Sequence, residues 1–323
     1  MERPTETAAS SPILYLVVPC YNEQEALPET DRQLRALFST MTEKGQISPM
    51  SKILYVDDGS NDSTWGLIAR LHHDNECICG VKLAANSGHQ NALVAGLTVA
   101  KENAEVMITI DADLQDDIQA IPKMLEKYAE GCDIVYGVRE SRESDTVFKR
   151  NTAQAFYKLM GALGVKTVYN HADFRLMSKR AVEQLLQFRE RNLFLRGIVP
   201  LIGYRSDKVY YNRSERLAGE SKYPFFKMLN FAIDGITSFS VKPVRLVLTL
   251  GLLFIVVAIG ILIYVIHAYV AGKAVPGWSS LILSMWFIGG CILVGIGIVG
   301  EYIGKIYLEV KDRPRFIIEK TLG

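Results

Sequence analysis

Residues 106–115 read Val-Met-Ile-Thr-Ile-Asp-Ala-Asp-Leu-Gln, and this segment shows most clearly how the chain is built. Its first five residues are mostly apolar and rich in β-branched side chains, which is typical of a strand covered on both faces. Asp111 and Asp113 follow where the strand gives way to a loop, and their spacing places both side chains on one side. The segment therefore predicts a buried strand with two carboxylates at its carboxyl end.

Two carboxylates this close repel each other unless a cation lies between them. Carboxylate oxygens suit Mg²⁺ and Mn²⁺, and Mg²⁺ is usually shared between one or two carboxylates and the phosphates of a substrate. We therefore predict that Asp111 and Asp113 bind a divalent metal, Mg²⁺ or Mn²⁺. A solvated Asp-x-Asp turn is the alternative for so short a motif, but the rest of the chain favours the metal site.

Short apolar runs alternate with amphipathic stretches on either side of this segment, over residues 13–137. The runs that we predict as strands are residues 13–18, 53–56, 81–83, 106–110 and 134–136. Such alternation predicts an α/β fold with a mostly parallel sheet and helices on both of its faces. Ligands of these folds gather beyond the carboxyl ends of the strands.

Polar residues follow three of the predicted strands, in the segments Tyr21-Asn22-Glu23, Asp57-Asp58 and Asp111-Ala112-Asp113. Turn capping would explain any one of these segments taken singly. Three of them at one edge of a sheet, one with the spacing of a metal site, favour a nucleotide-binding site.

The overall charge and the cysteines argue against a nucleic-acid-binding protein and against a disulfide-bonded one. The 36 Lys and Arg residues are balanced by 35 Asp and Glu residues, so nothing indicates nucleic-acid binding. The five cysteines show no framework of pairs, which fits a reducing compartment. Residues 1–11 are polar, so we expect no signal peptide and a cytosolic first domain.

The last quarter of the chain holds most of its apolar excess, and the mean hydropathy of the whole chain is positive. Residues 246–270 and 278–300 contain no Asp, Glu, Lys or Arg. Each is longer than the ~20 residues needed to cross the hydrocarbon core, which predicts two transmembrane helices. The basic residues outside this pair are Lys242, Arg245, Lys305, Lys311, Arg313 and Arg315. By the positive-inside rule, both flanks are cytosolic.

Residues 225–239 combine aromatic and aliphatic side chains with Lys227, Asn230 and Asp234. We predict an amphipathic helix in the membrane interface over residues 225–242. A helix that packs on its own domain is the alternative, and the sequence leaves both open.

Three motifs occur in a characteristic order and spacing, Val-Val-Pro-Cys-Tyr-Asn-Glu (17–23), Asp-Asp-Gly-Ser (57–60) and Asp-Ala-Asp-Leu-Gln (111–115). In this combination the chain resembles the family 2 glycosyltransferases with the Rossmann-like GT-A fold. Three later segments narrow the resemblance, namely Asp173-Phe174-Arg175-Leu176, Gly219-Glu220-Ser221-Lys222-Tyr223 and Gly300-Glu301-Tyr302-Ile303-Gly304-Lys305. They make the chain similar to polyisoprenyl-phosphate glycosyltransferases, including bactoprenol glucosyltransferases.

The resemblance implies a division into a GT-A glycosyltransferase domain, an interfacial helix and a membrane domain. The expected boundaries are 1–224, 225–242 and 243–323, with the catalytic domain and both termini in the cytosol. It also implies a multi-pass protein of the inner, cytoplasmic membrane that associates with copies of itself.

The donor implied by the resemblance is a nucleoside diphosphate sugar, such as UDP-glucose or a related UDP-sugar. The residues that would hold the uridine part, with Asp57 at the base or just behind it, are Pro19, Tyr21, Glu23 and Asp58. Asp111 and Asp113 would bind the metal-diphosphate, and Gln115 would lie near the sugar.

The acceptor implied by the resemblance is a polyprenyl phosphate such as undecaprenyl phosphate. The residues suited by their chemistry to its phosphate are Arg139, Arg213, Arg216, Ser221 and Lys222. For Arg139 and Arg213, a solvated surface charge is the alternative.

An inverting displacement at the anomeric carbon is the expected reaction, and Asp113 and Asp173 are the expected catalytic residues. The phosphate acceptor is already anionic near neutral pH, since the second pKa of a phosphate ester is about 6. A strong general base is therefore less necessary than for a hydroxyl acceptor. Asp173 matches the position of a base in relatives, but it could instead orient Arg175 or the sugar. The product would be a lipid-linked monosaccharide for modifying cell-surface glycans.

Two other functions are compatible with parts of the sequence. A processive polysaccharide synthase would share the first domain, but none of the three tryptophans completes the Gln-x-x-Arg-Trp motif of such enzymes. A non-catalytic membrane scaffold would have no need for acids at all three strand exits. The sequence does not identify the sugar.

Overall fold

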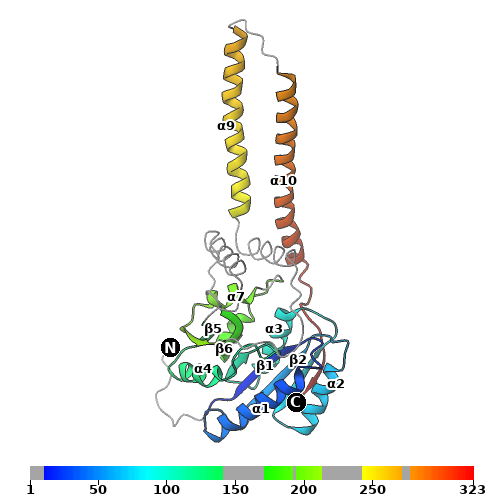
Figure 1. The fold of residues 1–323 in the computed structure, drawn as a ribbon, viewed down its shortest axis with the longest axis vertical. Helices are drawn as coiled ribbons and strands as arrows, with labels where there is room; N and C mark the ends of the chain where they lie inside the picture. Colours follow the sequence, from blue (N-terminus) through cyan, green and yellow to red (C-terminus); the bar gives the residue numbers. More distant parts are fainter. Residues whose placement is uncertain (1–10, 141–170, 192–193, 213–241, 271–276) are drawn as a thin grey trace. The chain divides into compact units, whose positions relative to one another are not determined.

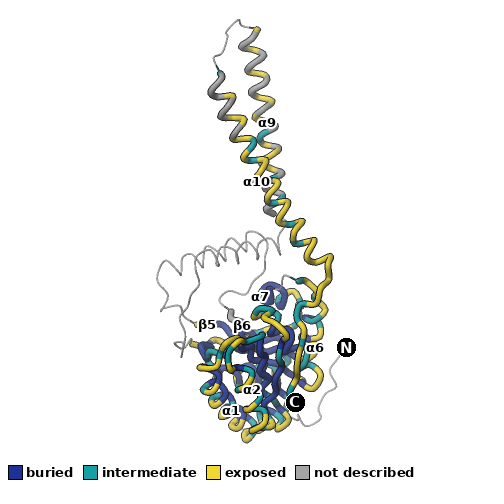
Figure 2. The backbone as a smooth tube through the Cα atoms, turned by 90° about the vertical axis from the view of Figure 1, so that its right-hand side faces the viewer, coloured by how far each residue is buried: buried dark blue, intermediate teal, exposed yellow. Residues whose placement is uncertain are grey.

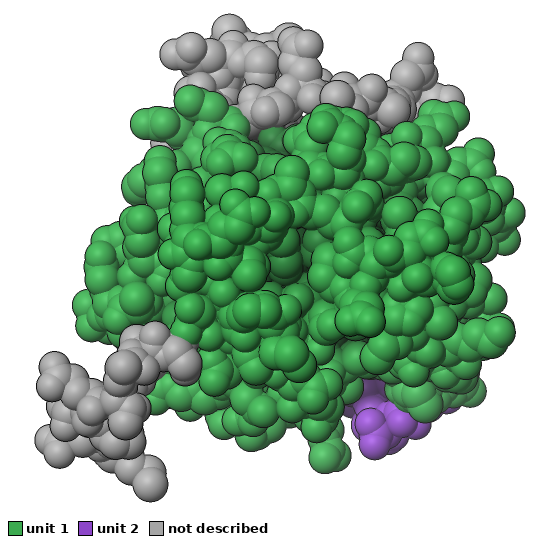
Figure 3. Space-filling view, turned by 90° about the horizontal axis from the view of Figure 1, so that it is seen from below, with its two compact units in different colours: residues 1–158, 166–223, 313–323 green, residues 159–165, 224–312 purple. Residues whose placement is uncertain are grey.

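The protein is described by a computed structural model that covers residues 11–140, 171–191, 194–212, 242–270 and 277–323 (Figure 1). Apart from its last residue, the predicted interfacial helix over residues 225–242 lies outside these ranges. The chain forms two compact units, which Figure 3 distinguishes by colour. Unit 1 comprises residues 1–158, 166–223 and 313–323, and unit 2 comprises residues 159–165 and 224–312.

Unit 1 is built on one eight-stranded sheet in the order β7-β5-β6-β4-β1-β2-β3-β8. The strands are β1 (Leu14–Cys20), β2 (Lys52–Asp57), β3 (Ile78–Leu83), β4 (Val106–Thr109), β5 (Ile134–Arg139), β6 (His171–Ser178), β7 (Ser206–Tyr211) and β8 (Ile318–Leu322). Four neighbouring pairs are parallel and three, all involving β6 or β8, are antiparallel. The sheet is thus mixed, with β4, β1, β2 and β3 forming the parallel centre that the sequence predicted.

Helices cover both faces of this sheet, as predicted. Within the described residues of unit 1 they are α1 (Leu27–Glu43), α2 (Thr64–Asp74), α3 (His89–Ala100), α4 (Ala120–Ala129), α6 (Lys179–Leu185), α7 (Leu195–Ile198) and the 3₁₀ helix η1 (Val199–Ile202). Leu16 and Val18 of β1 share a buried apolar cluster with Leu34 and Phe38 of α1. Val17 points to the opposite face, because side chains alternate along a strand. There it meets Gly96 of α3.

The close approach of α3 to the sheet depends on Gly96. A Cβ atom built on this residue would lie 2.4 Å from Cγ1 of Val17 and 2.8 Å from Cγ2 of Val56. We expect Gly96→Ala to lower the free energy of unfolding by about 1–3 kcal/mol, as overpacked cores do. Gly66→Ala in α2 is the control, since nothing lies within 4 Å of its Cβ position. That change should stabilise the helix by about 0.5–1 kcal/mol. Chemical denaturation measures both values, and a neutral Gly96→Ala would contradict the packing.

Several predicted strand bounds are wrong: β3 begins at Ile78 instead of residue 81, β5 ends at Arg139 instead of residue 136, and β1 ends later than predicted. The sequence placed the end of the first strand at Val18, before Pro19, but β1 continues through Pro19 to Cys20. The pairing of β1 with β4 ends at Val17, while its pairing with β2 continues to Cys20. At Pro19, β1 therefore has a paired strand on one side only. The missing N–H group of the proline removes no hydrogen bond between two paired strands.

Strand β8 was not expected from the sequence. It follows α10 (Trp278–Val310) and returns to the edge of the sheet, where it pairs antiparallel with β3. Lys82 lies opposite Lys320, and the N–H of Ala84 donates to the carbonyl oxygen of Ile317 at 2.9 Å. Residues 313–323, at the end of the chain, thus belong to the same unit as residues 1–158 and 166–223.

Unit 2 contains two long helices, α9 (Lys242–Val270) and α10. They contact each other through an edge-to-face pair of Phe254 and Phe287, whose ring centres are 5.8 Å apart. Within the described residues, Phe287–Val310 is the one segment found long and apolar enough to cross a membrane. Leu293 is 71% exposed, and Figure 2 shows how exposure along α10 contrasts with the buried strands of unit 1. α10 continues ten residues beyond the predicted end of the second span at Gly300.

Candidate active site

The carboxyl ends of β4, β1, β2 and β3 lie side by side, because these strands are neighbours and run parallel. β6 joins them from the opposite direction and places Asp173 beside β4. The hydroxyl of Thr109 donates to the backbone carbonyl of Asp173 at 2.5 Å. This antiparallel strand is the reason that a residue 60 positions after the Asp-Ala-Asp motif reaches the same edge.

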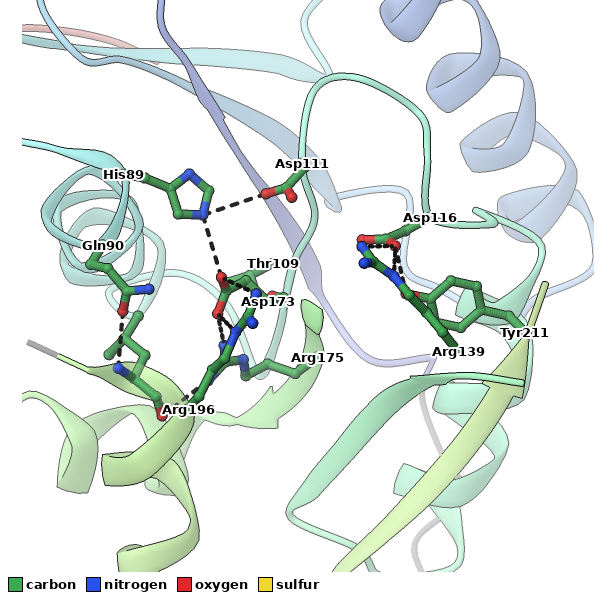
Figure 4. A network of polar contacts seen from close by, with 11 residues as sticks. His89, Gln90, Thr109, Asp111, Asp116, Arg139, Asp173, Arg175, Arg196 and Tyr211 are labelled. Carbon is green, nitrogen blue, oxygen red and sulfur yellow. Dashed lines mark hydrogen bonds and ion pairs between the residues drawn. The ribbon is translucent and has the colours of Figure 1, made fainter. Parts of the chain in front are cut away.

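His89, Asp111 and Asp173 form one cluster, drawn in Figure 4. Nε2 of His89, at the start of α3, lies 3.4 Å from Oδ1 of Asp111 and 3.7 Å from Oδ2 of Asp173. The predicted metal ligand Asp111 and the predicted catalytic Asp173 therefore share one neighbour. Sequence reasoning did not single out His89. Its position at the start of the helix that follows the third strand was the available signal.

Asp111 is held in an electrostatically unfavourable place. Its Oδ1 atom is buried and accepts no hydrogen bond within the described part of the chain. The pKa of Asp111 is raised to about 6, chiefly by burial; His89 acts to lower it, and the carboxylates of Asp173, Asp116 and Asp113 add to the rise. A bound cation would relieve both the missing hydrogen bond and the repulsion, so the site fits a divalent metal.

The turn after Asp111 has a strained backbone. Leu114 has a φ angle of +52°, which non-glycine residues rarely adopt. This conformation accompanies a hydrogen bond from the N–H of Gln115 to Oδ1 of Asp113 at 3.2 Å. Gln115, predicted to lie near the sugar, is buried in this turn. Among the residues that the structure describes, no group of three or more His, Cys, Asp or Glu side chains is arranged to hold a metal.

Asp173 lies between two arginines. Its Oδ1 accepts a short hydrogen bond from Nη2 of Arg175, which is 1% exposed, and its Oδ2 accepts one from Nη2 of Arg196 at 3.2 Å. Burial raises the pKa of Asp173, but Arg196, Arg175 and His89 outweigh burial and hold it well below its usual range. A carboxylate so stabilised is a weak base. This geometry favours the orienting role that the sequence left open.

Short helix α7 carries Arg196 to this cluster, and two contacts fix the helix. The N–H of Leu195 donates to Oε1 of Gln90 at 2.9 Å, and Nη1 of Arg175 donates to the carbonyl oxygen of Leu195 at 3.3 Å. Arg196 was also missed from the sequence, and no local signal could have found it. It meets Asp173 only through the packing of α7 against β6 and the start of α3.

Arg139, a predicted ligand of the acceptor phosphate, is held by Asp116. Its Nη2 and Nε atoms lie 2.9 Å and 3.2 Å from Oδ1 of Asp116, and the hydroxyl of Tyr211 donates to the same oxygen at 2.5 Å. Figure 4 shows this group beside the Asp111 cluster. The side chain of Arg139 remains 25% exposed.

The two acids after β2 are both buried and engaged by the backbone. Asp57 accepts a hydrogen bond from the N–H of Ser60 at 3.2 Å, while its Oδ2 is buried and has no partner among the described residues. Asp58 accepts two, from the N–H groups of Ser87 at 2.7 Å and Gly88 at 2.9 Å. Asp58 thus fixes the loop that leads into α3 and so helps to place His89.

A pocket of about 370 Å³ opens where β1, β2 and β3 end. Tyr21, predicted to contact the uridine part, lines it and is 44% exposed. Pro19 is buried in β1, and Glu23 is partly exposed, with its N–H donating to Oγ1 of Thr64 at 2.9 Å. The remaining predicted site residues, Arg213, Arg216, Ser221 and Lys222, lie outside the described residues.

Comparison with known proteins gives consistent matches. Residues 15–186 match the model of a family described as glycosyl transferase family 2. The chain is 54% identical to the uncharacterized glycosyltransferase YkoT of Bacillus subtilis (strain 168), over 97% of this chain and 93% of that protein. It is 42% identical to the bactoprenol glucosyl transferase of Shigella phage SfII, over 95% of this chain and 97% of that protein. One solved structure, mannosyltransferase PcManGT of Pyrobaculum calidifontis with GDP-Man and Mn²⁺, is 15% identical over 95% of this chain and 88% of its own, with a TM-score of 0.46.

Proposed function

The chain belongs to glycosyl transferase family 2, and from this premise we propose that it transfers a sugar from a nucleoside diphosphate sugar to a polyprenyl phosphate. The reaction would take place at the cytosolic face of the membrane. UDP-glucose or a related UDP-sugar is the proposed donor, and undecaprenyl phosphate is the proposed acceptor. The product would be a lipid-linked monosaccharide that serves the modification of cell-surface glycans.

The acceptor is proposed from the relatives. Proteins named bactoprenol glucosyl transferase match the chain over nearly the whole of both lengths, including the C-terminal helices. An acceptor with a long apolar tail also suits a chain whose α10 exposes large apolar side chains such as Met285 and Leu293.

The environment of Asp111 is the observation that supports a binding site for the nucleoside diphosphate sugar. A buried carboxylate oxygen that accepts no hydrogen bond among the described residues, with only His89 at 3.4 Å to oppose three other acids, fits a site that a cation completes. We propose that Asp111 and Asp113 hold a divalent ion, Mg²⁺ or Mn²⁺, together with the diphosphate of the donor. When bound, such an ion would stabilise the charge that develops on the departing diphosphate.

Two transmembrane helices are proposed from the connection of the chain. β8 follows α10 and pairs with β3, so residues 313–323 belong to the same unit as residues 1–158 and 166–223. A chain that leaves a water-soluble domain and returns to it crosses a membrane an even number of times. α10 contains one segment able to cross, and α9 is a 29-residue helix, about 44 Å long at 1.5 Å per residue. Two crossings, with the basic flanks in the cytosol, meet this condition.

The protein groups at the site suit a direct inverting displacement. The nucleophile would be a phosphate oxygen that is already anionic, so no residue has to remove a proton. Asp173, held by Arg175 and Arg196, would keep those arginines in place, and Asp58 would fix the loop that carries His89. Arg139, whose side chain is 25% exposed, would contact the acceptor phosphate. Arg213, Arg216, Ser221 and Lys222 stay proposed ligands of the same phosphate.

The test is a transfer assay with the full-length protein in detergent or in membranes. We expect label from one of a panel of nucleoside diphosphate sugars to enter a chloroform-soluble product in the presence of undecaprenyl phosphate. Mass spectrometry of that product identifies the sugar. A chelator should stop the reaction, and added Mg²⁺ or Mn²⁺ should restore it. If no donor in the panel yields a prenyl-linked sugar, or if chelation has no effect, the proposal is wrong.

A further inference from the structure

The pocket at the ends of β1, β2 and β3 has a fourth wall, which comes from the opposite end of the chain. Tyr21, Asn61 and Asn86 line it from the loops after the three parallel strands. Glu319 of β8 completes the lining. A residue that follows both long helices in the sequence therefore faces the pocket that the first domain builds.

Glu319 is joined to Lys82 of β3. Nζ of Lys82 lies 2.8 Å from Oε2 of Glu319, and the two side chains are 26% and 42% exposed. Lys82 lines the pocket as well, so both charges are at its surface. β8 itself is held by its register with β3 and by the hydrogen bond from Ala84 to Ile317. The ion pair thus sits on a backbone whose position is fixed.

This lining has the chemistry of a site for a planar ring with polar edges. An exposed tyrosine offers a flat apolar surface, and the Asn61 and Asn86 amides offer donors and acceptors. The Lys82 ammonium has three N–H donors, of which the ion pair uses one, and a carboxylate accepts several hydrogen bonds. A ring that carries an N–H beside a carbonyl oxygen can therefore bond to both members of the pair.

We propose that β8 forms one wall of the nucleobase pocket, and that Glu319 positions Lys82 to recognise a base with a ring N–H beside a carbonyl oxygen. Uracil and guanine have this edge. Cytosine and adenine present an unprotonated ring nitrogen and an amino group there, so a site built for the first pair leaves its own polar groups unpaired with the second. The inference rests on the proposed function, because it assumes a nucleotide donor.

The experiment measures dissociation constants of UDP, GDP, CDP and ADP for the full-length protein in Mg²⁺ by calorimetry, and KM and kcat for the accepted sugar donor. Three variants are compared: Glu319→Gln, the charge exchange Lys82→Glu with Glu319→Lys, and Lys320→Gln as the control on the same strand. Lys320 is exposed and does not line the pocket. Thermal unfolding of each variant reports whether β8 remains in the sheet.

We expect Glu319→Gln to weaken UDP or GDP binding about tenfold and to raise KM by the same factor, with kcat within about twofold. The charge-exchange variant should unfold at the wild-type thermal midpoint, because an ion pair still joins β3 and β8. It should nevertheless fail to bind the base. Lys320→Gln should bind as the wild type does. Wild-type affinity in Glu319→Gln, or full recovery in the charge exchange, would overturn the inference in favour of a purely structural pair. A wild-type protein that binds no nucleoside diphosphate would instead overturn the proposed function.

Discussion

Replacing Asp111 by asparagine is expected to slow sugar transfer at least about 10³-fold, because the amide removes one of the two charges proposed to hold the cation. Stabilisation of a leaving group by a bound ion is worth several kcal/mol, and each 1.36 kcal/mol is a factor of ten in rate. We expect the substitution not to lower the stability of the folded state. Asp111 lies among Asp113, Asp116 and Asp173, which repel its charge, so a neutral side chain there relieves repulsion.

Initial rates of transfer check the predicted loss of activity, and the thermal midpoint of the same preparation checks the predicted stability. Asp117→Asn is the matched control, since Asp117 belongs to the same loop and only caps the N–H of Gln119, at 2.9 Å. It should transfer sugar at close to the wild-type rate. An Asp111→Asn protein that keeps the wild-type rate would remove the metal role from the site.

Replacing Asp173 by asparagine should have its main effect on folding. The change leaves the buried guanidinium of Arg175 without its anion, and breaking a buried ion pair in this way costs about 3–5 kcal/mol. If Asp173 were instead a general base, the variant would lose activity and keep its stability. Denaturation of the purified protein distinguishes the two.

Two controls make this prediction specific. The double variant Asp173→Asn with Arg175→Met should regain most of the lost stability, since no buried charge remains. Glu29→Gln breaks an exposed pair with Arg32 on α1 and should leave the unfolding midpoint unchanged. An Asp173→Asn protein as stable as the Glu29→Gln protein would contradict the ion-pair assignment.

The pH dependence of stability should follow from the same contacts. Asp173 has a lowered pKa in the folded protein, whereas the unfolded carboxyl titrates near its ordinary value of about 3.9. Its stabilising effect is therefore complete above about pH 5 and is lost as the pH falls below about 4. Unfolding curves of the wild type should show this acid loss, and those of Asp173→Asn should show less of it.

The centre of the fold could be predicted because its signals are local. The strands β1, β2 and β4 are continuous apolar runs, and such runs indicate strands covered on both faces. The rule that ligands gather at the carboxyl ends of parallel strands then brought Tyr21, Asp57 and Asp111 to one edge. Nothing beyond the order and the composition of the segments was needed.

The surroundings of the site could not be predicted, because they depend on contacts between distant segments. The sequence Ile-Glu-Lys-Thr-Leu of β8 is short and two of its five residues are charged, and it becomes a strand by pairing with β3, more than 200 residues earlier. Arg196 reaches Asp173 only after α7 has packed. Arg139 was predicted to bind the acceptor phosphate, but no local pattern indicates that Asp116 holds it.

The edge strand β8 also fixes an order of events during synthesis. Ribosomes extend a chain from its N-terminus, so residues 318–322 are made only after α9 and α10. Until then β3 exposes an unpaired edge, and the pocket beside Lys82 lacks the wall that Glu319 supplies. Unit 1 can thus be completed only after both long helices have been synthesised, so its folding depends on the last residues of the chain to be translated.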